Sequence, residues 1–336
     1  EPLAIGGFTP LEKVYEFNPI APEMTPDQAA FVLGGQANIW TEYIPNFNQV
    51  EYMVYPRALA LAQALWCEKK PIYSVFKEAL LNYHLPNLKR IGVNYSEAMF
   101  YPELQIKRVE GGLEYSVTSV DGLDLNIERI ENNGVISQTI ASPYVLERSG
   151  SGLIQQFSMN VSHENLSKET QFRITEHPSI GLNVEYITAP SKSYNSGGDL
   201  TLVDGVIGAK PWRGNEWVGF REKEIELIVD LGNKKLIESI DLNFLLDEGS
   251  WIYHPNEVQF QISSNKKKWK ELKSSTLQLN SKKMSPGKFL LFGSAIGKKG
   301  RYLKLIILPF DKIPEGKPGT GSIPWTFMDE LIIFYK

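Results

Sequence analysis

Apolar residues in the first part of the chain recur mostly at three- and four-residue spacing, the pattern of helices with one buried face. The spacing predicts an amphipathic helix from Val50 to Trp66 despite Pro56 within it, and another over residues 74–90. A shorter helix is expected after Thr25, a capping residue with Gln28 three positions later. This part of the chain is therefore predicted to be mainly helical.

One segment between these helices has a different pattern. "GGQANIW" (34–40) is interpreted as a strand entering from a glycine turn, with "TEYI" as its exit. Helix, strand and two helices make up one or two units of a repeating βα architecture. A complete (β/α)8 barrel takes about 250 residues, so a segment of about ninety residues cannot close one.

Beyond about Met99 the apolar residues alternate with polar ones, as in "LEYSVTSV", and glycine turns separate the runs. This pattern predicts a small antiparallel β module over 99–178, with a boundary near Pro178. The remaining residues, 179–336, contain a series of strand-like runs without helices between them, which predicts a β-sandwich. The runs are "IELIVDLG", "ESIDLNFLL", "EVQFQIS", "KFLLFGS", "RYLKLIIL" and "DELIIFY".

Composition excludes several classes of protein. The formal net charge of −4 argues against a nucleic-acid binder, and Lys-rich runs such as "NKKKWK" (265–270) are interpreted as solvated strand edges. Cys67 is the only cysteine, so no internal disulfide is possible. No apolar run approaches the roughly 18 residues needed to span a bilayer. Because the chain begins at Glu1 without methionine, we interpret it as a processed or truncated product.

The candidate chemistry lies in "LGGQANIWTEYI" (33–44). Glu42 is its only acid and follows Trp40 by two residues, so on an ideal strand both side chains face the same side. An aromatic face beside a carboxylate suits a sugar, because the ring packs on C–H groups and the carboxylate accepts hydroxyl protons. Spacing alone is equally compatible with a core tryptophan beside a surface glutamate.

"GGQANIWTEYI", followed by "VEYMVYPRALALAQALW", resembles the last strand and helix of the family 20 glycoside hydrolase barrel, that of the β-N-acetylhexosaminidases. The resemblance covers residues 1–98 and implies the C-terminal fragment of a TIM barrel. It implies that Trp40 walls the pocket for the N-acetyl group and that Glu42 binds outer sugar hydroxyls, with Tyr43 as a third substrate-binding residue. The catalytic Asp–Glu pair of the family lies upstream of any residue here, so no catalytic residue is expected in this chain.

The last part, 179–336, resembles the discoidin-like, galactose-binding-like jelly-roll sandwich found in carbohydrate-binding modules. The resemblance rests on "LVDGVIGA", "WRGNEWVGF", "GSWIYHPNEVQFQIS" and "MDELIIFY". Four residues in its polar loops form a candidate second sugar site, with Trp212 expected to be exposed and Trp217 and Trp251 alternatively packing the base of the sandwich. These residues are Trp212, Arg213, Trp217 and Trp251.

Two acids in the last part match positions where this fold often holds a structural Ca²⁺ ion, Asp204 and Glu330. Calcium takes six to eight oxygen ligands, so main-chain carbonyl groups would have to contribute. The alternative is that Asp204 caps a turn. No other cofactor is expected.

Together these features predict part of a periplasmic or secreted β-N-acetylhexosaminidase that removes terminal N-acetylhexosamine from glycans, inactive without the rest of its barrel. The rival hypothesis is a non-enzymatic carbohydrate-binding or adhesion module. Because an incomplete barrel leaves apolar faces and strand edges uncovered, residues 1–70 are expected to be partly rearranged or to self-associate.

Overall fold

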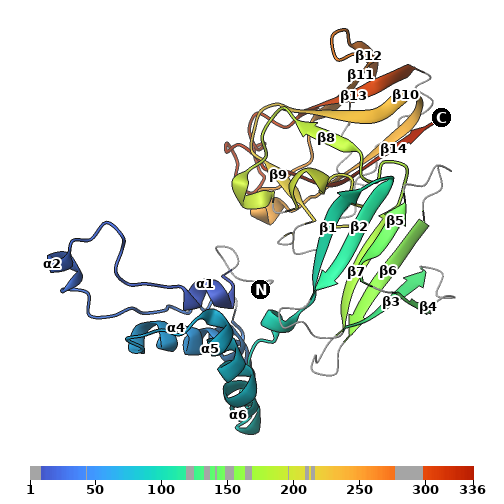
Figure 1. Ribbon diagram of the computed structural model, residues 1–336. Helices are drawn as coiled ribbons and strands as arrows, with labels where there is room; N and C mark the ends of the chain where they lie inside the picture. Colours follow the sequence, from blue (N-terminus) through green and yellow to red (C-terminus); the bar gives the residue numbers. More distant parts are fainter. Residues whose placement is uncertain are drawn as a thin grey trace. The chain divides into compact units, whose positions relative to one another are not determined.

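The computed structural model describes residues 9–42, 44–118, 125–131, 137–140, 142–147, 155–162, 169–195, 197–208, 212, 216–276 and 298–336. Its contacts divide the chain into two compact units, Glu1–Tyr101 and Pro102–Lys336 (Figure 1). None of the described helices in either unit has the length and hydropathy to cross a membrane.

The first unit is helical. Its core is made by one face of several short helices, with Tyr15, Phe76 and Leu80 among its most buried side chains. The helical elements are α1 (Leu11–Tyr15), α2 (Pro26–Ala29), α3 (Phe47–Val54), α4 (Arg57–Trp66), α5 (Tyr73–Ala79), the π-helical turn η1 (Leu80–His84), α6 (Leu85–Arg90) and the 3₁₀ turn η2 (Ala98–Phe100).

The helix predicted over 74–90 is confirmed, because α5, η1 and α6 follow one another without a break. The cap at Thr25 is also confirmed: its hydroxyl accepts the N–H of Gln28, whose side chain accepts the N–H of Thr25. The single helix predicted through Pro56 is wrong. It divides into α3 and α4 at that residue, because proline lacks an N–H group and its ring clashes with the preceding turn.

The strand predicted at "GGQANIW" is also wrong. Residues 34–41 have no secondary structure, and the described part of the first unit contains no strand that would pair with them. A strand is stable only when its N–H and C=O groups bond to a neighbouring strand. The residue pattern of this segment is therefore not sufficient to make it a strand without a neighbouring strand.

The second unit is built from antiparallel β-strands. The module that follows Tyr101 holds two small sheets, ordered β1-β2-β5 and β4-β3-β6-β7. Its strands are β1 (Glu103–Val109), β2 (Gly112–Thr118), β3 (Asn126–Glu131), β4 (Ser137–Thr139), β5 (Tyr144–Glu147), β6 (Gln155–Ser162) and β7 (Thr170–Glu176).

The remainder of this unit is a sandwich whose strands run in the order β12-β11-β13-β10-β14-β9, with β8 also paired to β10. The first part of β10 pairs with β13 and its second part with β14, and the register shifts between Asp230 and Lys235. The strands are β8 (Asn183–Tyr186), β9 (Val218–Phe220), β10 (Ile225–Phe244), β11 (Glu257–Ser263), β12 (Lys270–Thr276), β13 (Lys299–Leu308) and β14 (Thr326–Tyr335), with 3₁₀ turns η3 (Lys192–Tyr194), η4 (Gly198–Leu200) and η5 (Glu248–Ser250). The predicted run "KFLLFGS" lies outside the described residues.

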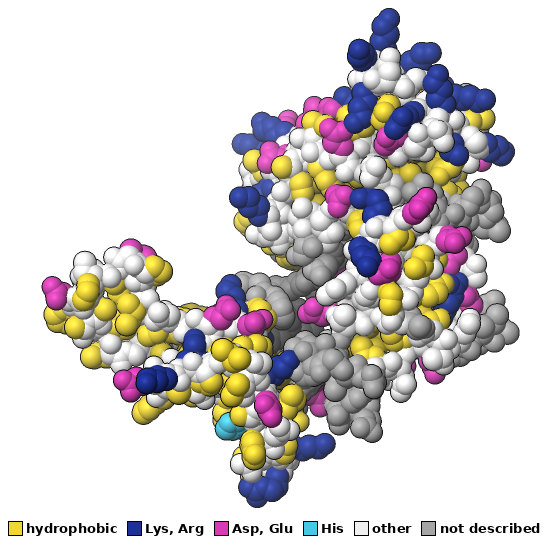
Figure 2. Space-filling model, in the orientation of Figure 1, with side chains coloured by type: hydrophobic (Ala, Val, Ile, Leu, Met, Phe, Trp, Pro, Cys, Tyr) yellow, Lys and Arg dark blue, Asp and Glu magenta, His cyan; other side chains and the backbone are white. Residues whose placement is uncertain are grey.

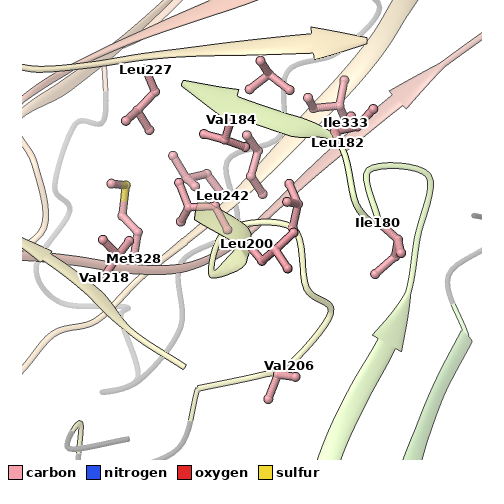
Figure 3. Close-up of a cluster of buried hydrophobic side chains, with 14 of the residues drawn as sticks. Ile180, Leu182, Val184, Leu200, Val206, Val218, Leu227, Leu242, Met328 and Ile333 are labelled. Carbon is pink, nitrogen blue, oxygen red and sulfur yellow. The ribbon is translucent and has the colours of Figure 1, made fainter. Parts of the chain in front are cut away.

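One hydrophobic core runs through the β module and the sandwich. It joins Tyr115 and Phe157 of the module to Leu242 and Met328 of the sandwich. Figure 3 shows part of this core, with Leu182, Leu200 and Leu242 among the clustered side chains and Val206 at its edge. The predicted division between residues 178 and 179 therefore falls within a single compact unit.

Candidate functional site

The Trp40 and Glu42 side chains both lie on the surface of the first unit. Trp40 is 73% exposed and Glu42 is also exposed, so the described part of this unit does not enclose them in a pocket. The segment is anchored at Gly35, which passes so close to Phe17 and Leu65 that a Cβ there would stand 2.8 Å and 3.2 Å from their atoms. Tyr43 lies outside the described residues.

Large apolar side chains are exposed across the same unit. Figure 2 shows much of its visible face in yellow, the colour of hydrophobic side chains. Leu33 is 99% exposed and Trp66 is 89% exposed. Monomeric soluble proteins rarely expose so many large apolar side chains on one surface. The other strongly exposed apolar residues are Phe31, Trp40, Phe47, Ile72, Tyr83 and Ile91.

In the second unit, aromatic rings gather around Tyr194 at one end of the sandwich. Its ring centroid lies 5.4 Å from that of Trp212 and 5.0 Å from that of Trp325. Trp212 also donates its Nε1–H to Oδ2 of Asp247 at 3.1 Å. Trp212 is therefore half-buried and held in place, not freely exposed as its loop position predicts.

The other tryptophans of the predicted sugar site divide between core and surface. Trp217 is buried, with 2% of its surface exposed, as expected if it packs the base of the sandwich. Trp251 keeps 38% of its surface exposed, has a left-handed backbone conformation (φ 61°), and lies against Gly319, where a Cβ would come within 2.8 Å of its ring. Arg213 lies outside the described residues.

Three buried carboxyl groups lie near enough to influence one another where the β module joins the sandwich. Asp204, Asp329 and Glu330 are each no more than 4% exposed. Oδ1 of Asp204 accepts the N–H of Val206 at 2.8 Å, the turn cap that was the alternative to a metal role. Oε2 of Glu330 has no hydrogen-bond partner among the described residues.

Burial makes charge on these groups unfavourable. It raises the pKa of Asp204 well above its ordinary value, and repulsion from Asp329 adds to the rise. Burial also raises the pKa of Glu330, with further contributions from the Asp204 and Asp329 charges. Carboxyl groups in such an environment are stabilised by a proton or by a cation.

His177 supplies one of the few donors to this cluster. Its Nε2 lies 2.9 Å from Oε1 of Glu330, and its Nδ1 accepts the N–H of Ser179 at 3.2 Å. Burial lowers the pKa of His177 to about 3. The imidazole is therefore neutral, with its proton on Nε2 and directed at the glutamate.

The carboxyl cluster fits a hard cation in its chemistry, because calcium prefers oxygen ligands and one glutamate oxygen lacks a partner. The described residues contain no group of three or more His, Cys, Asp or Glu side chains arranged to hold a metal. Asp204 and Glu330 would therefore need main-chain carbonyl ligands. The carbonyl of Asp204 itself already accepts the Tyr115 hydroxyl at 2.6 Å.

A helical unit with an exposed Trp-x-Glu segment is thus joined to a β unit with tryptophan-bearing loops, a combination suited to contact with sugars. Residues 1–69 match the family model "Glycosyl hydrolase family 20, catalytic domain". The resemblance inferred from "GGQANIWTEYI" is thereby confirmed for this segment.

Two relatives give the extent of the likeness. The chain is 40% identical over 98 residues to a beta-hexosaminidase of Porphyromonas gingivalis, covering 26% of this chain and 13% of that protein. It is 41% identical over 58 residues to beta-hexosaminidase subunit alpha of Bos taurus, covering 17% of this chain and 11% of that one. The chain thus matches only a small part of the length of these relatives.

Solved structures also align with nearly half of the chain. One is the C-terminal domain of a chitobiase from Bacteroides fragilis, at 18% identity and a TM-score of 0.28, covering 46% of this chain and 94% of that one. Another is CBM32-5 of Clostridium perfringens in complex with GalNAc-β-1,3-galactose, at 13% identity and a TM-score of 0.32, with the same coverage.

Sequence reasoning missed one carboxyl group of this cluster and two residues that hydrogen-bond to its members. Asp329 stands beside Glu330 in "MDEL", so the adjacent acid was a usable signal. His177 and Tyr115 carry no such signal, because they are separated from Glu330 by more than 150 residues. Tyr115 lies on β2, and His177 directly follows β7. Only folding brings them to the cluster.

Proposed function

We propose that this chain is part of a β-N-acetylhexosaminidase that removes terminal, non-reducing N-acetylhexosamine residues from glycans in the periplasm or outside the cell. The observation that carries this proposal is the match of residues 1–69 to the family 20 catalytic domain, over the segment that holds Trp40 and Glu42. The mechanism would be retaining and substrate-assisted, the variant in which the substrate's acetamido group is the nucleophile.

In this proposal Trp40 packs on the acetamido side of the sugar, and Glu42 and Tyr43 bind its outer hydroxyl groups. The exposure of Trp40 supports the idea that other parts of a barrel complete the pocket to which this segment belongs. The same holds for the exposed apolar residues Leu33 and Trp66. The remainder of that barrel is the proposed partner of the first unit, and it would supply the Asp–Glu pair.

The test has two stages. The purified chain is expected to release no nitrophenol from a nitrophenyl N-acetylglucosaminide, and turnover by this chain alone would contradict the proposal. In a gene product that carries a complete barrel, Glu42→Gln is expected to lower kcat/KM by about 10- to 100-fold, the worth of a charge-assisted hydrogen bond. Glu16→Gln, an exposed acid of the same unit, is the control and is expected to change little.

We also propose that the loop Asp247–Ile252 of the sandwich offers a sugar-stacking surface, with Trp251 as its platform. Two observations support this: Trp251 is partly exposed in a strained left-handed conformation, and Asp247 ties the loop to Trp212. Trp212 then positions the loop, and Trp217 belongs to the core beneath it.

A glycan array tests this surface. Trp251→Ala is expected to abolish binding of neutral glycans, whereas Trp66→Ala, an exposed tryptophan of the first unit, is expected to leave it unchanged. A null array for the unmodified chain would favour a purely structural sandwich. Glycan binding that persists in Trp251→Ala would show that the sugar site lies elsewhere in the chain.

Finally, we propose a structural Ca²⁺ at Asp204 and Glu330, supported by the partnerless Oε2 of Glu330 among buried carboxyl groups. A bound calcium ion would neutralise these charges and stabilise the surrounding turns. Calcium in excess over EDTA is expected to raise the Tm of the second unit, and Glu330→Gln to remove this response. An equal Tm in calcium and in EDTA would contradict the proposal.

A further inference from the structure

Positive charge is segregated in this acidic chain. Of the 53 residues from Val258 to Phe310, 12 are Lys or Arg and only Glu271 is acidic, a formal charge of +11. Because the whole chain carries −4, the other 283 residues carry −15. Such a concentration of positive charge in one part of a domain favours a surface that binds anions over a surface that is only solvated.

The strand register brings the cations of separate segments to one end of the sandwich. Tyr302 on β13 pairs with Ser263 on β11 and with Asp230 on β10. The turn that follows Ser263 and the irregular part of β10 that follows Asp230 therefore flank the start of β13. We call this region the basic end; its cationic residues are Lys234, Lys235, Lys266, Lys267, Lys268, Lys298, Lys299 and Arg301.

Figure 2 shows Lys and Arg side chains, in dark blue, gathered over the part of the molecule that Figure 1 labels β11, β12 and β13. Neighbouring strands in a sheet lie about 4.8 Å apart. The turn after β11, the start of β13 and the irregular part of β10 thus present their cations next to one another at this end of the sheet.

Only part of this charge is neutralised within the chain. Glu185 pairs with Lys266, and Asp230 makes two 2.8 Å bonds to Arg301. Among the described residues, Lys234, Lys267, Lys268 and Lys299 are exposed and form no ion pair. The stretch that lies outside the described residues, 277–297, contains no acid that would neutralise them.

Aromatic rings lie among these cations. The Tyr302 ring lies 5.2 Å from Lys266 and 5.0 Å from the Arg301 guanidinium. Trp269, next to Lys268, lies 4.7 Å from the ammonium of Lys304, which borders the basic end on β13. Cation–π contacts restrict these long side chains. The basic end is therefore partly ordered before any ligand arrives, which lowers the entropy cost of binding.

We propose that the basic end binds an acidic polysaccharide, a glycan bearing sulfate or carboxylate groups along its chain. The choice of a glycan rests on the proposed glycan-directed function of the chain. The unpaired lysines of the basic end fit a chain of spaced anions, and the neighbouring rings suit sugar C–H faces.

Charge and surface argue against other polyanions. Duplex DNA carries a charge about every 1.7 Å, and the −15 on the rest of the chain would repel so long and dense an anion. A membrane surface is usually bound with apolar side chains inserted. The turn from Ser264 to Lys268 has none, and Trp269 beside it is half-buried.

Binding of fluorescein-labelled heparin to the full chain, followed by anisotropy over a salt series, tests this. Lys267→Gln/Lys268→Gln is expected to weaken binding about tenfold and to reduce the slope of log K against log salt by about 2, because two ionic contacts are lost. The control variant Lys89→Gln/Arg90→Gln removes the same charge from exposed positions in α6 and is expected to change the affinity by less than about twofold.

Three outcomes would overturn the proposal: no heparin binding at low salt, equal losses in both double variants, or tighter binding of duplex DNA or anionic vesicles than of heparin. Neutral dextran is the control for charge. Trp251→Ala should leave heparin binding intact, so failure of the neutral-sugar surface and failure of the basic end are distinguishable.

Discussion

Nε2 of His177 lies 2.9 Å from Oε1 of Glu330, and both side chains are shielded from solvent. His177 follows β7 of the β module, and Glu330 lies on β14 of the sandwich. The hydrogen bond therefore joins the two parts of the second unit, and it also satisfies one oxygen of a buried carboxyl group.

Replacing His177 with leucine is expected to destabilise the second unit by about 2–4 kcal/mol, because Glu330 would stay buried with one partner fewer. Urea unfolding in EDTA, followed by tryptophan fluorescence, measures the change. His84→Leu is the control, since His84 is exposed in the first unit. Equal stability of the two variants would show that the bond contributes nothing.

Gly205 is expected to tolerate no side chain. Its φ is +76°, and a Cβ would stand 2.7 Å from the carbonyl oxygen of Thr175 and 2.8 Å from Cδ1 of Ile180. Gly205→Ala should cost about 2–4 kcal/mol, because backbone strain and collision add. Gly316 has a similar φ of +80° with open space around it, so Gly316→Ala should cost only about 1 kcal/mol.

Thermal or urea unfolding of the two alanine variants separates these causes. If both variants lose the same stability, the collision at Gly205 has no energetic consequence and the surrounding turns relax around the new methyl group.

Stability is expected to fall in acid through His254. Burial lowers the pKa of His254 to about 4, and only 3% of its surface is exposed. Because the unfolded chain takes up this proton near pH 6.5 and the folded chain resists it until about pH 4, the unfolded state gains stability as the pH falls between these values. The loss should approach about 3 kcal/mol near pH 4.

His254→Asn separates this effect from the titration of other groups. Urea unfolding at a series of pH values should give a flatter profile for the variant between pH 6.5 and 4 than for the unmodified chain. Parallel profiles would show that His254 is not the responsible group.

The first unit is expected to self-associate. Leu33 and Trp66 expose nearly their whole side chains, and burying such surface contributes about 25 cal/mol per Å². Light scattering should show a mass that rises with concentration, and Leu33→Ser/Trp66→Ser should lower it. Val145→Ser in the second unit, an exposed apolar residue, is the control. A clean monomer at all concentrations would contradict the prediction.

Much of the local structure could be predicted from the sequence because its causes are local. The helix over 74–90 follows from the spacing of its apolar residues, and the helix cap at Thr25 from a hydroxyl and an amide three residues apart. The strands of the sandwich follow from short strand-like apolar runs without helices between them. Where prediction failed, a non-local condition decided: "GGQANIW" has strand-like residues, but the described residues of the first unit offer no strand to pair with them.

The candidate sites divide in the same way. Residue order is enough to reveal the Trp40-x-Glu42 motif, its family resemblance and the excess of lysine between Val258 and Phe310. Tertiary structure alone decided that Trp217 is buried while Trp251 is exposed, that His177 meets Glu330, and that lysines from three segments share one end of the sandwich. Such contacts join residues far apart in the chain, and only the strand register and core packing bring them together.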